Sequence, residues 1–293
     1  MVGIVKEPVI AVYEGPYTET LTKDGLMVSA IVDEGLYGMI FGVTGEEEGG
    51  FTPVKTFYGY TGYVKTEEML WIHARDGKAW DDSGLMVAGG RYTDVVSAPR
   101  VRGVRLQSLY RGSLVRVIEL ESEETGWAKV GLVDGSVGYM RNQYLWRKEF
   151  SQAGAWEPRL PQKVVEETSF REEVVKRAVS YLGVQYRWGG RSTAGIDCSG
   201  LTSACYMLCG ILIYRDARVV EGFPVHEIAA SEMKPGDLLY FPGHIAMYLG
   251  NGSYIHATGR AGSGGVVINS LNPSAADYRA DLADSLYAVG SIF

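Results

Sequence analysis

Short apolar runs broken by Gly, Asp and Thr fill the first half of the chain, and this texture limits the possible folds more than any other feature. Runs such as VIAVYEG and LMVSAIVDEG have the length of β-strands, and turn residues bound them. From Val164 onward the texture changes to two helical periods followed by four short strands. Because the helices precede these strands and do not alternate with them, the sequence predicts an α+β fold.

Two segments of the first half end alike. GYVKTEEML begins at Gly62 and GYMRNQYL begins at Gly138, 76 positions later (138 minus 62). A repeat of this kind predicts two copies of one small β-barrel. The first copy is expected to carry an insertion at TGEEEGGFTPVKT (residues 44–56), and residues 71–90 show no regular pattern.

The chain is therefore expected to have four parts, which are a first barrel over residues 1–85, a second over 86–150, a linker with two prolines over 151–163 and an α+β domain over 164–293. In the last part, a first helix is predicted to start at a capping box of Ser169 and Glu172 and to end at Gly183. A second helix should begin near Cys198 and stop at Gly210, ahead of the strands GDLLYF, HIAMYLG, YIHATG and GVVINSL.

The bulk composition excludes some classes of partner. The net charge of −7 argues against DNA, RNA or wall polyanions as electrostatic partners. Three cysteines on one helix are not a disulfide framework, and no run reaches the ~18 apolar residues of a membrane span. The N-terminal segment has no pattern of a signal peptide, so we expect a cytoplasmic protein. A truncated N-terminus would look the same and would fit a secreted or wall-associated protein.

Cys198 stands where the second helix begins. Backbone N–H groups and the helix dipole at such a position stabilise a thiolate, so a lowered thiol pKa is expected. A thiolate with a histidine is the minimum for acyl transfer, and His244 and His256 lie at the start and end of predicted strands. The alternative for Cys198 is that of a small core residue.

The remaining cysteines and histidines carry simpler interpretations. Cys205 and Cys209 are expected to be core residues of the second helix. The cysteines lack a paired CxxC, so no metal and no cofactor are expected. His73 and His226 have no reactive companions and are expected to be surface or satisfied histidines.

The two histidines share a sheet face only under one condition. If the hairpin loop spans residues 250–252, residue 256 opposes 246, and both imidazoles lie on one face within diagonal reach. A loop of only Asn251 and Gly252 would place them on opposite faces. A Cys–His–His triad therefore needs an odd loop or a bulge here. In that triad Cys198 attacks, His244 is the base and His256 orients His244.

Residues 169–271 resemble the NlpC/P60 cysteine peptidases of peptidoglycan. The matching segments are YRWGG (186–190), DCSGL (197–201), RDA (215–217), KPGDLLYF (234–241), HIAMYLGNG (244–252) and YIHATG (254–259). The resemblance implies a papain-like α+β catalytic domain whose triad is Cys198, His244 and His256. The two barrels resemble bacterial SH3 (SH3b) domains, and this arrangement is similar to that of the dipeptidyl-peptidase VI-like subgroup.

That resemblance implies an activity. Enzymes of this subgroup cut the γ-D-Glu–L-Lys or γ-D-Glu–diaminopimelate bond of free stem peptides and release L-Ala-γ-D-Glu, without a metal. Their first SH3b domain caps the cleft and admits only a free N-terminal L-Ala. Here this implies a peptidoglycan-derived peptide as partner, and we expect a monomer.

The resemblance also implies substrate-binding residues, which are Tyr186, Trp188, Asp197, Ser199 and Asp216 in the last domain and Glu14 and Tyr60 in the first barrel. Asp216 should bind the substrate ammonium, since a buried cation needs a carboxylate partner. Tyr186 should line the oxyanion region beside the Cys198 backbone N–H.

Each of these assignments has an alternative. Asp24 and Tyr58 are rivals for the first-barrel pair. A loop salt bridge with Arg215 is the alternative for Asp216, and core packing is the alternative for Tyr186 and Trp188.

Four functions are therefore weighed. The first is an intracellular recycling peptidase, and the second is a secreted lytic endopeptidase that acts on intact peptidoglycan. The third is a non-catalytic wall- or peptide-binding module, which the intact Cys–His–His set disfavours. The fourth is an acyltransferase or amidase on the same scaffold, because the triad determines the acyl-enzyme step and not the acceptor.

Overall fold

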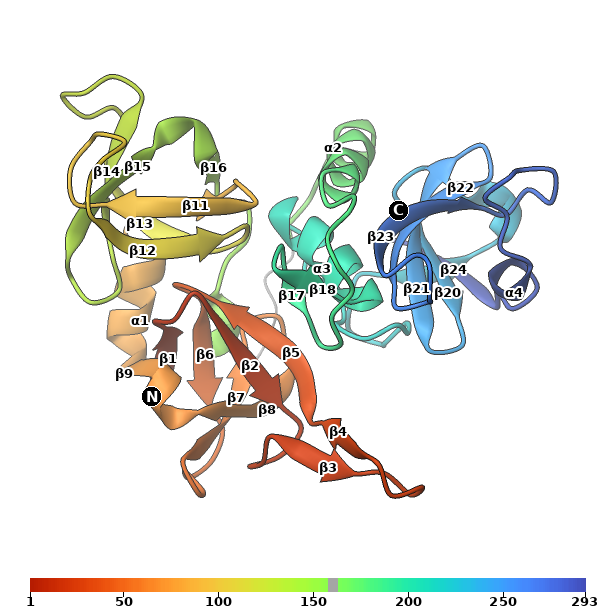
Figure 1. Ribbon diagram of the computed structural model, residues 1–293, viewed down its shortest axis with the longest axis horizontal. Coiled ribbons are helices and arrows are strands. Elements are labelled where there is room, and N and C mark those ends of the chain that lie inside the picture. The colour runs from red at the N-terminus through yellow and green to blue at the C-terminus, as the bar shows by residue number, and fades with distance from the viewer. Residues whose placement is uncertain (158–162) are drawn as a thin grey trace. The chain divides into compact units, whose positions relative to one another are not determined.

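The computed structural model describes residues 1–157 and 163–293, and residues 158–162 of the predicted linker lie outside the described part (Figure 1). The chain separates into two compact units, residues 1–161 and 162–293, each with its own sheets. Helices and antiparallel strands are both present without regular alternation, so the predicted α+β fold is confirmed. Within the described residues, no helix has the length and apolar character needed to cross a membrane.

Unit 1 contains two seven-stranded antiparallel sheets with one strand order. In spatial order the first consists of β5 (Ile31–Leu36), β2 (Val9–Tyr13), β8 (Thr61–Lys65), β7 (Phe51–Thr56), β6 (Ile40–Val43), β1 (Val2–Val5) and β9 (Met69–Ile72). The second consists of β12 (Arg105–Tyr110), β11 (Tyr92–Val96), β15 (Val137–Arg141), β14 (Trp127–Gly131), β13 (Leu114–Glu119), β10 (Leu85–Ala88) and β16 (Leu145–Arg147). In chain order the strands match one for one, which confirms the predicted repeat. The described pairings leave two edge strands in each sheet, so neither is a closed barrel.

The insertion predicted at residues 44–56 is wrong, because residues 51–56 are β7, a strand that both copies have, and the connection before it, residues 44–50, is as long as residues 120–126 of the second copy. The extra element of the first copy is a hairpin of β3 (Glu19–Leu21) and β4 (Met27–Ser29). It lies between β2 and β5, a connection that occupies residues 14–30 here and only 97–104 in the second sheet. The matching segments, β8 and β15, both follow this connection, so their spacing could not reveal it.

Residues 71–90 are more regular than the sequence indicated. They contain the end of β9, helix α1 (Ala74–Asp81) and β10. Helix α1 is short and polar and buries only Gly77, where a Cβ atom would meet the side chain of Val2 at 2.7 Å. Such a helix has no apolar stripe for a pattern to detect.

One core joins the two sheets of unit 1. Tyr37, which follows β5, packs among residues of the second sheet, and its hydroxyl accepts a hydrogen bond from the backbone N–H of Val133 at 2.7 Å. Its carbonyl accepts from the N–H of Leu114 at 2.8 Å. The indole of Trp80, on helix α1 between the two sheets in the chain, donates to the carbonyl of Gly38 at 3.0 Å. The two copies are therefore packed into one body rather than joined only by the chain.

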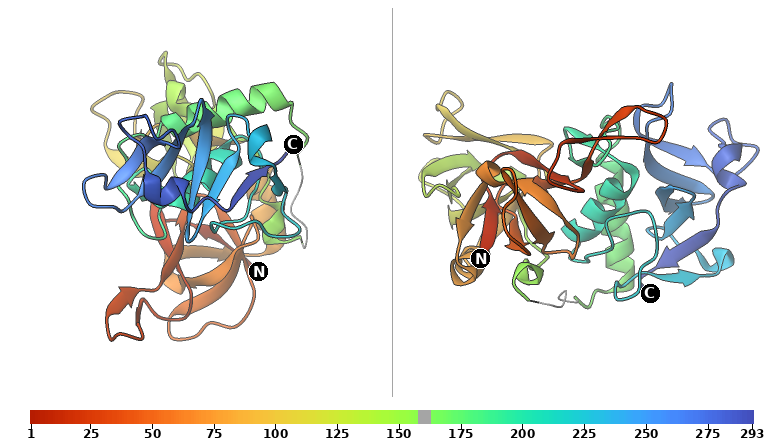
Figure 2. Two further views of the ribbon diagram at one scale, coloured as in Figure 1. Left: turned by 90° about the vertical axis from the view of Figure 1, so that its right-hand side faces the viewer. Right: turned by 90° about the horizontal axis from the view of Figure 1, so that it is seen from below.

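Unit 2 combines helices with one six-stranded sheet. Its elements are α2 (Glu167–Val179), the two-stranded hairpin of β17 (Arg191–Ser192) and β18 (Gly195–Ile196), α3 (Cys198–Leu208), α4 (Ala280–Ala283) and a sheet of β19 (His226–Ile228), β24 (Ala288–Ser291), β20 (Leu238–Phe241), β21 (His244–Gly250), β22 (Ser253–Thr258) and β23 (Gly265–Ser270). The second helix and the four strands were predicted, and β19, β24 and the hairpin were not. One face of the sheet packs on α2 and α3, and the other face carries α4 (Figure 2).

Helix α2 begins earlier than predicted. Glu166 is its N-cap, and its carboxylate accepts from the backbone N–H groups of Thr168 and Ser169 at 2.9 and 2.8 Å. These bonds lower the pKa of Glu166 to about 2. Ser169 therefore lies inside the first turn, and the capping box of Ser169 and Glu172 is wrong. A glutamate performs the capping that Ser, Thr, Asp or Asn usually perform.

Candidate active site

Helix α3 starts at Cys198 because Asp197 caps it. Asp197 has an extended backbone, and its Oδ1 accepts from the backbone N–H of Gly200 at 2.6 Å. A Cβ atom on Gly200 would lie 2.0 Å from the carbonyl oxygen of Gly190, so only glycine lets the preceding loop pack against this turn. The DCSG segment is thus a helix start held against a loop, with the cysteine at its first position.

Arg215 anchors this helix start, a role that the sequence analysis, which named Arg215 only beside Asp216, did not predict. Its guanidinium is 1% exposed and meets both carboxylate oxygens of Asp197 at 3.0 Å each. It also donates to the Ser199 hydroxyl at 2.7 Å and to the carbonyls of Gly189 and Gly190 at 3.0 and 3.3 Å. Four groups around Cys198 are therefore tied to one side chain.

This network changes the interpretation of the RDA segment. Arg215 reaches back to Asp197, so its guanidinium belongs to the start of α3. A loop salt bridge stays the alternative for Asp216. Asp216 itself is half-buried, and its backbone carbonyl accepts from the N–H of Arg218. Asp197 and Ser199 are buried and bonded to Arg215, and contact of either with substrate stays a prediction.

The two histidines lie on one face because of a bulge. Strands β21 and β22 pair at Gly250 with Ser253 and at Tyr248 with Tyr254, and the register shifts between these pairs. The hairpin loop thus has two residues, and the bulge at Leu249 supplies the odd residue that the triad requires. Beyond the bulge the register of the two strands places position 256 opposite position 246. The described ladder stops at the pair of residues 247 and 255, and both strands continue past it.

A short hydrogen bond joins the imidazoles. Nε2 of His244 lies 2.7 Å from Nδ1 of His256, and the rings are nearly perpendicular, at 80°. This leaves Nδ1 as the ring nitrogen of His244 that is available to another group. On the far side, Nε2 of His256 lies 2.9 Å from Oδ1 of Asn269. Asn269 was not singled out in the sequence, although it lies on GVVINSL, two positions after the residue that pairs with His256.

Burial sets the protonation of Cys198. The backbone N–H groups of Ile245, on β21, and Ser199 donate to its sulfur and lower the thiol pKa. Burial and the charge of Asp197 act in the opposite direction, burial more strongly, and together they raise the pKa to about 11. The prediction of a lowered pKa is therefore wrong, although the helix N–H group of Ser199 acts in the predicted direction. The resting thiol is neutral, and it needs a base when it attacks.

The histidines can supply that base. Burial, followed by the neighbouring His256 and by Arg279, lowers the pKa of His244 to about 3. Burial likewise lowers the pKa of His256 to about 4. At neutral pH both rings are therefore uncharged, and His244 has an unprotonated nitrogen. The Ile245 contact places the sulfur beside the residue that follows His244.

The two aromatic residues of YRWGG have different environments. Tyr186 is half-buried, forms a bridge with Ile196 and contacts Gly259. Burial, followed by the negative charges of Cys198 and Asp197, raises its pKa to about 12. Trp188 is 66% exposed, so core packing does not apply to it.

Other expectations for single residues have clear outcomes. Cys205 and Cys209 are buried in the core of unit 2, as predicted. His73 and His226 are both exposed. Across residues 1–157 and 163–293, no three His, Cys, Asp or Glu side chains are grouped so as to hold a metal ion.

The candidates in the first sheet remain predictions. Glu14 is exposed and accepts from the hydroxyl of Tyr17 at 3.5 Å, and Tyr60 is half-buried before β8. Of the rivals, Asp24 is exposed, whereas Tyr58 is buried and donates to the buried carboxylate of Asp33 at 2.5 Å. Sequence reasoning missed Asp33, whose only signal is an acidic residue inside an apolar strand.

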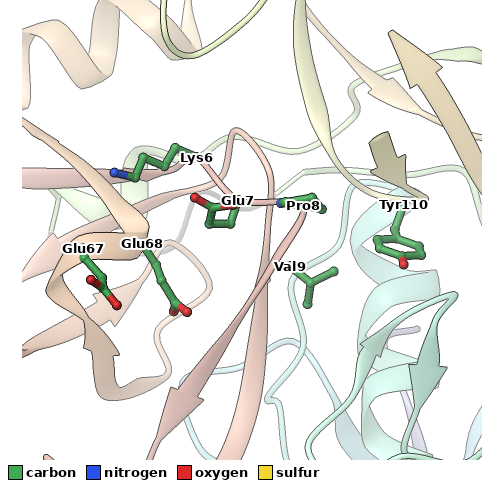
Figure 3. Close-up of a pocket in the computed structure, with 7 residues that line it drawn as sticks. All are labelled: Lys6, Glu7, Pro8, Val9, Glu67, Glu68 and Tyr110. Carbon is green, nitrogen blue, oxygen red and sulfur yellow. The ribbon is translucent and has the colours of Figure 1, made fainter. Parts of the chain in front are cut away.

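A pocket of about 700 Å³ also lies within unit 1 (Figure 3). The first sheet provides most of its wall and the second sheet provides one residue, the lining being Lys6, Glu7, Pro8, Val9, Glu67, Glu68 and Tyr110. Burial raises the pKa of the Glu68 carboxyl there. None of the predicted site residues lines this pocket.

Comparison with known proteins agrees with this geometry. Residues 183–281 match the NlpC/P60 family. Dipeptidyl-peptidase 6 of Lysinibacillus sphaericus is 40% identical over 264 residues, which cover 90% of this chain and 92% of that protein. Gamma-D-glutamyl-L-lysine dipeptidyl-peptidase of Bacillus subtilis is 28% identical over 157 residues, which cover 50% of this chain and 46% of that protein.

A solved structure extends the similarity of fold to the whole chain. The crystal structure of an NlpC/P60 family protein from Bacillus cereus has a TM-score of 0.72, covers 99% of this chain and 98% of that chain, and is 18% identical. The fold is thus shared across both units. With a 40% identical relative matched over nearly its full length, the chain belongs to the NlpC/P60 family and is a peptidase.

Proposed function

We propose that this protein hydrolyses the bond between γ-D-Glu and L-Lys or diaminopimelate in peptidoglycan stem peptides that begin with a free L-Ala, and so releases L-Ala-γ-D-Glu. The observation that carries the proposal is the similarity to dipeptidyl-peptidase 6 over 92% of that protein, in a chain that has a cysteine and two linked histidines at one site. The Bacillus subtilis relative, whose name specifies a γ-D-glutamyl-L-lysine bond, supports the same bond type.

The proposed reaction has two steps. In the first, the Cys198 sulfur attacks the γ-carbonyl of D-Glu while Nδ1 of His244 takes the thiol proton. The tetrahedral intermediate collapses as that proton passes to the leaving amine of residue three, and a thioester remains. In the second, a water attacks the thioester and gives its proton to His244, which returns it to the departing sulfur. His256 holds His244 in place throughout.

The surroundings of Cys198 suit the charge that develops. The backbone N–H of Cys198 and the hydroxyl of Tyr186 are the proposed donors to the oxyanion. The raised thiol pKa supports concerted proton transfer, because the neutral thiol has to lose its proton to His244 as the new bond forms. No step of this scheme uses a metal or a cofactor.

Substrate selection is proposed to depend on the peptide's ammonium group. Asp216 is the proposed carboxylate partner in unit 2, and a role for Glu14 and Tyr60 of unit 1 stays a separate prediction. A free peptide of this kind fits a recycling enzyme of the cytoplasm, and cell fractionation tests that location. Asp216→Asn should lower kcat/KM for the free-amine peptide by about 100-fold, since a buried ammonium without its partner is costly.

The decisive experiment compares two substrates. L-Ala-γ-D-Glu-L-Lys and its N-acetylated form are incubated with the enzyme, with Cys198→Ala as control, and products are identified by mass spectrometry. Cleavage of the free amine alone supports the proposal. Cleavage of both forms, or of intact peptidoglycan, contradicts it and favours a lytic wall endopeptidase. Activity that survives in Cys198→Ala contradicts the proposed mechanism itself.

A further inference from the structure

Asn269 is placed to act on the histidine pair. In the β22–β23 ladder His256 pairs with Val267, so the side chain of Asn269, two residues further along β23, lies on the same face as His256. Oδ1 of Asn269 is 2.9 Å from Nε2 of His256. His256 is fully buried, so this ring cannot exchange its partners for water.

A second bond determines which way the Asn269 amide faces. Its Nδ2 donates to the backbone carbonyl of Asp277 at 2.8 Å. A flipped amide would place Oδ1 against that carbonyl, where two acceptors would face each other, and would place Nδ2 against His256. The Asp277 carbonyl can only accept, so it keeps the Asn269 oxygen directed at the imidazole.

The orientation of the Asn269 amide determines the tautomer of His256, and through it that of His244. An amide oxygen accepts only, so Nε2 of His256 carries a proton. A neutral His256 then has a lone pair on Nδ1, and the bond of 2.7 Å to His244 requires that Nε2 of His244 be the donor. The remaining nitrogen of His244, Nδ1, is left without a proton. That is the nitrogen that has to accept the thiol proton.

We propose that Asn269 is a positioning residue that sets the tautomers of both histidines, so that His244 presents an unprotonated Nδ1 to Cys198. The opposite tautomer of His244 would direct an N–H at the thiol and could not act as a base. The inference rests on the proposed Cys198–His244–His256 chemistry, but it does not depend on which peptide is cut.

The direct test reads the tautomers. Histidine nitrogens are observed by ¹⁵N NMR in the free enzyme at neutral pH, in wild type and in Asn269→Leu, whose side chain has a similar volume and no acceptor. Wild type should show His244 and His256 protonated at Nε2, and the variant should show a mixture of tautomers for both rings. A wild-type His256 protonated at Nδ1 overturns the proposal without any variant, and so does an unchanged tautomer pattern in Asn269→Leu.

A second test measures thiol reactivity without any peptide. The rate of Cys198 alkylation by iodoacetamide, located by mass spectrometry, should fall about twofold or more in Asn269→Leu, because an even mixture of tautomers leaves about half of the molecules without the base. Asn269→Asp keeps an acceptor and should react at a rate close to wild type. The matched control is Asn272→Leu, an exposed amide that accepts from Ser274, and it should leave the rate unchanged. Equal rates in Asn269→Leu and wild type overturn the proposal.

The kcat and KM values of the Asn269 variants distinguish a positioning role from a merely structural one. With L-Ala-γ-D-Glu-L-Lys, Asn269→Leu should lower kcat with KM unchanged, and Asn269→Asp should restore kcat. The carboxylate of Asn269→Asp should also shift the acidic limb of kcat/KM to higher pH, in addition to the existing effects of Arg279 and Asp281, the other charged groups that face the pair. If Asn269→Leu does not fold, the tautomers in the wild-type ¹⁵N NMR spectrum and the activity of Asn269→Asp still test the proposal. If the peptide is not a substrate, the NMR and alkylation results stand, so the two failures are distinguishable.

Discussion

Unit 2 contains two clusters of an arginine, a buried aspartate and a buried serine, and they differ in what lies beside them. In the first, Arg215 meets Asp197 and Ser199 at the start of α3. In the second, Arg171 of α2 meets Asp237 at 2.8 Å, and Ser291 of β24 donates to the same carboxylate oxygen at 2.7 Å. The aspartates also cap backbone N–H groups in both clusters.

The difference shows how one set of interactions serves two purposes. The second cluster ties a helix to two strands of the sheet, so its loss should weaken the unit without moving a reactive atom. The first cluster holds the residues on either side of Cys198, so its loss should also move the sulfur relative to His244. A buried ion pair is a poor source of net stability but a strict positional constraint. The comparison therefore predicts equal effects on stability and unequal effects on catalysis.

The largest effect on catalysis should come from removing the Cys198 thiol, which lies beside the first cluster and not beside the second. Cys198→Ala should lower kcat by about 10⁴-fold or more, because it removes the thiol that forms the acyl-enzyme. Peptide turnover by mass spectrometry checks this, and circular dichroism confirms the fold. Cys205→Ala, on the same helix but inside the core, is the matched control and should retain activity once corrected for folded protein.

Breaking each ion pair tests the comparison itself. Arg215→Met and Arg171→Met should each lower the free energy of unfolding by about 3–5 kcal/mol, because each leaves a buried carboxylate without its partner. Only Arg215→Met should lower kcat/KM strongly, by about 100-fold, since a small displacement of the nucleophile is enough. Urea unfolding and turnover of folded enzyme are measured on both variants. Similar kcat/KM values in the two would show that the first cluster has no special role.

Acid should lower the stability of the folded protein by protonating His244 and His256. The folded-state pKa values of His244 and His256 are lowered to about 3 and about 4, below the 6.5 of an unperturbed histidine. The unfolded chain therefore binds more protons between pH 6.5 and 4, so stability is complete above pH 6.5 and is lost as the pH falls. His256 alone should account for a loss on the order of 3 kcal/mol.

Urea unfolding across this pH range measures the loss. In His256→Gln the free energy of unfolding should depend less on pH over this range. His226→Gln is the control, because His226 is exposed on β19, opposite Ser291 of the second cluster, and it should leave the slope unchanged. A wild-type curve that is flat from pH 6.5 to 4 would contradict the buried neutral pair.

Local patterns were enough to predict much of the site. The apolar period of α3, its start at Cys198 and the four strands of unit 2 are all visible in the sequence, because each depends on neighbours a few positions away. The need for a bulge also follows from counting positions between His244 and His256. Counting positions could not show whether a longer loop or a bulge meets this need, and the structure has a bulge at Leu249.

Contacts between distant positions were not predictable in the same way. Arg215 reaches Asp197 only because the chain returns to α3 after leaving it, and no period links these positions. Asn269 meets His256 through a strand register that depends on the connection between β22 and β23. The pKa of Cys198 could not be predicted because the direction of its shift depends on burial, which outweighs the N–H groups of Ser199 on α3 and Ile245 on β21.

The smallest expected effects distinguish the two serines. Ser199→Ala and Ser291→Ala each remove a buried hydroxyl bonded to an arginine and an aspartate, and each should cost about 1 kcal/mol of stability. Ser199→Ala should also lower kcat a few-fold with KM unchanged, because Arg215 loses one of its bonds next to Cys198. If Ser199 instead contacts substrate, KM should rise while kcat holds. Ser291→Ala should change neither constant, so the split between kcat and KM in the first variant shows whether that hydroxyl positions the nucleophile or binds the peptide.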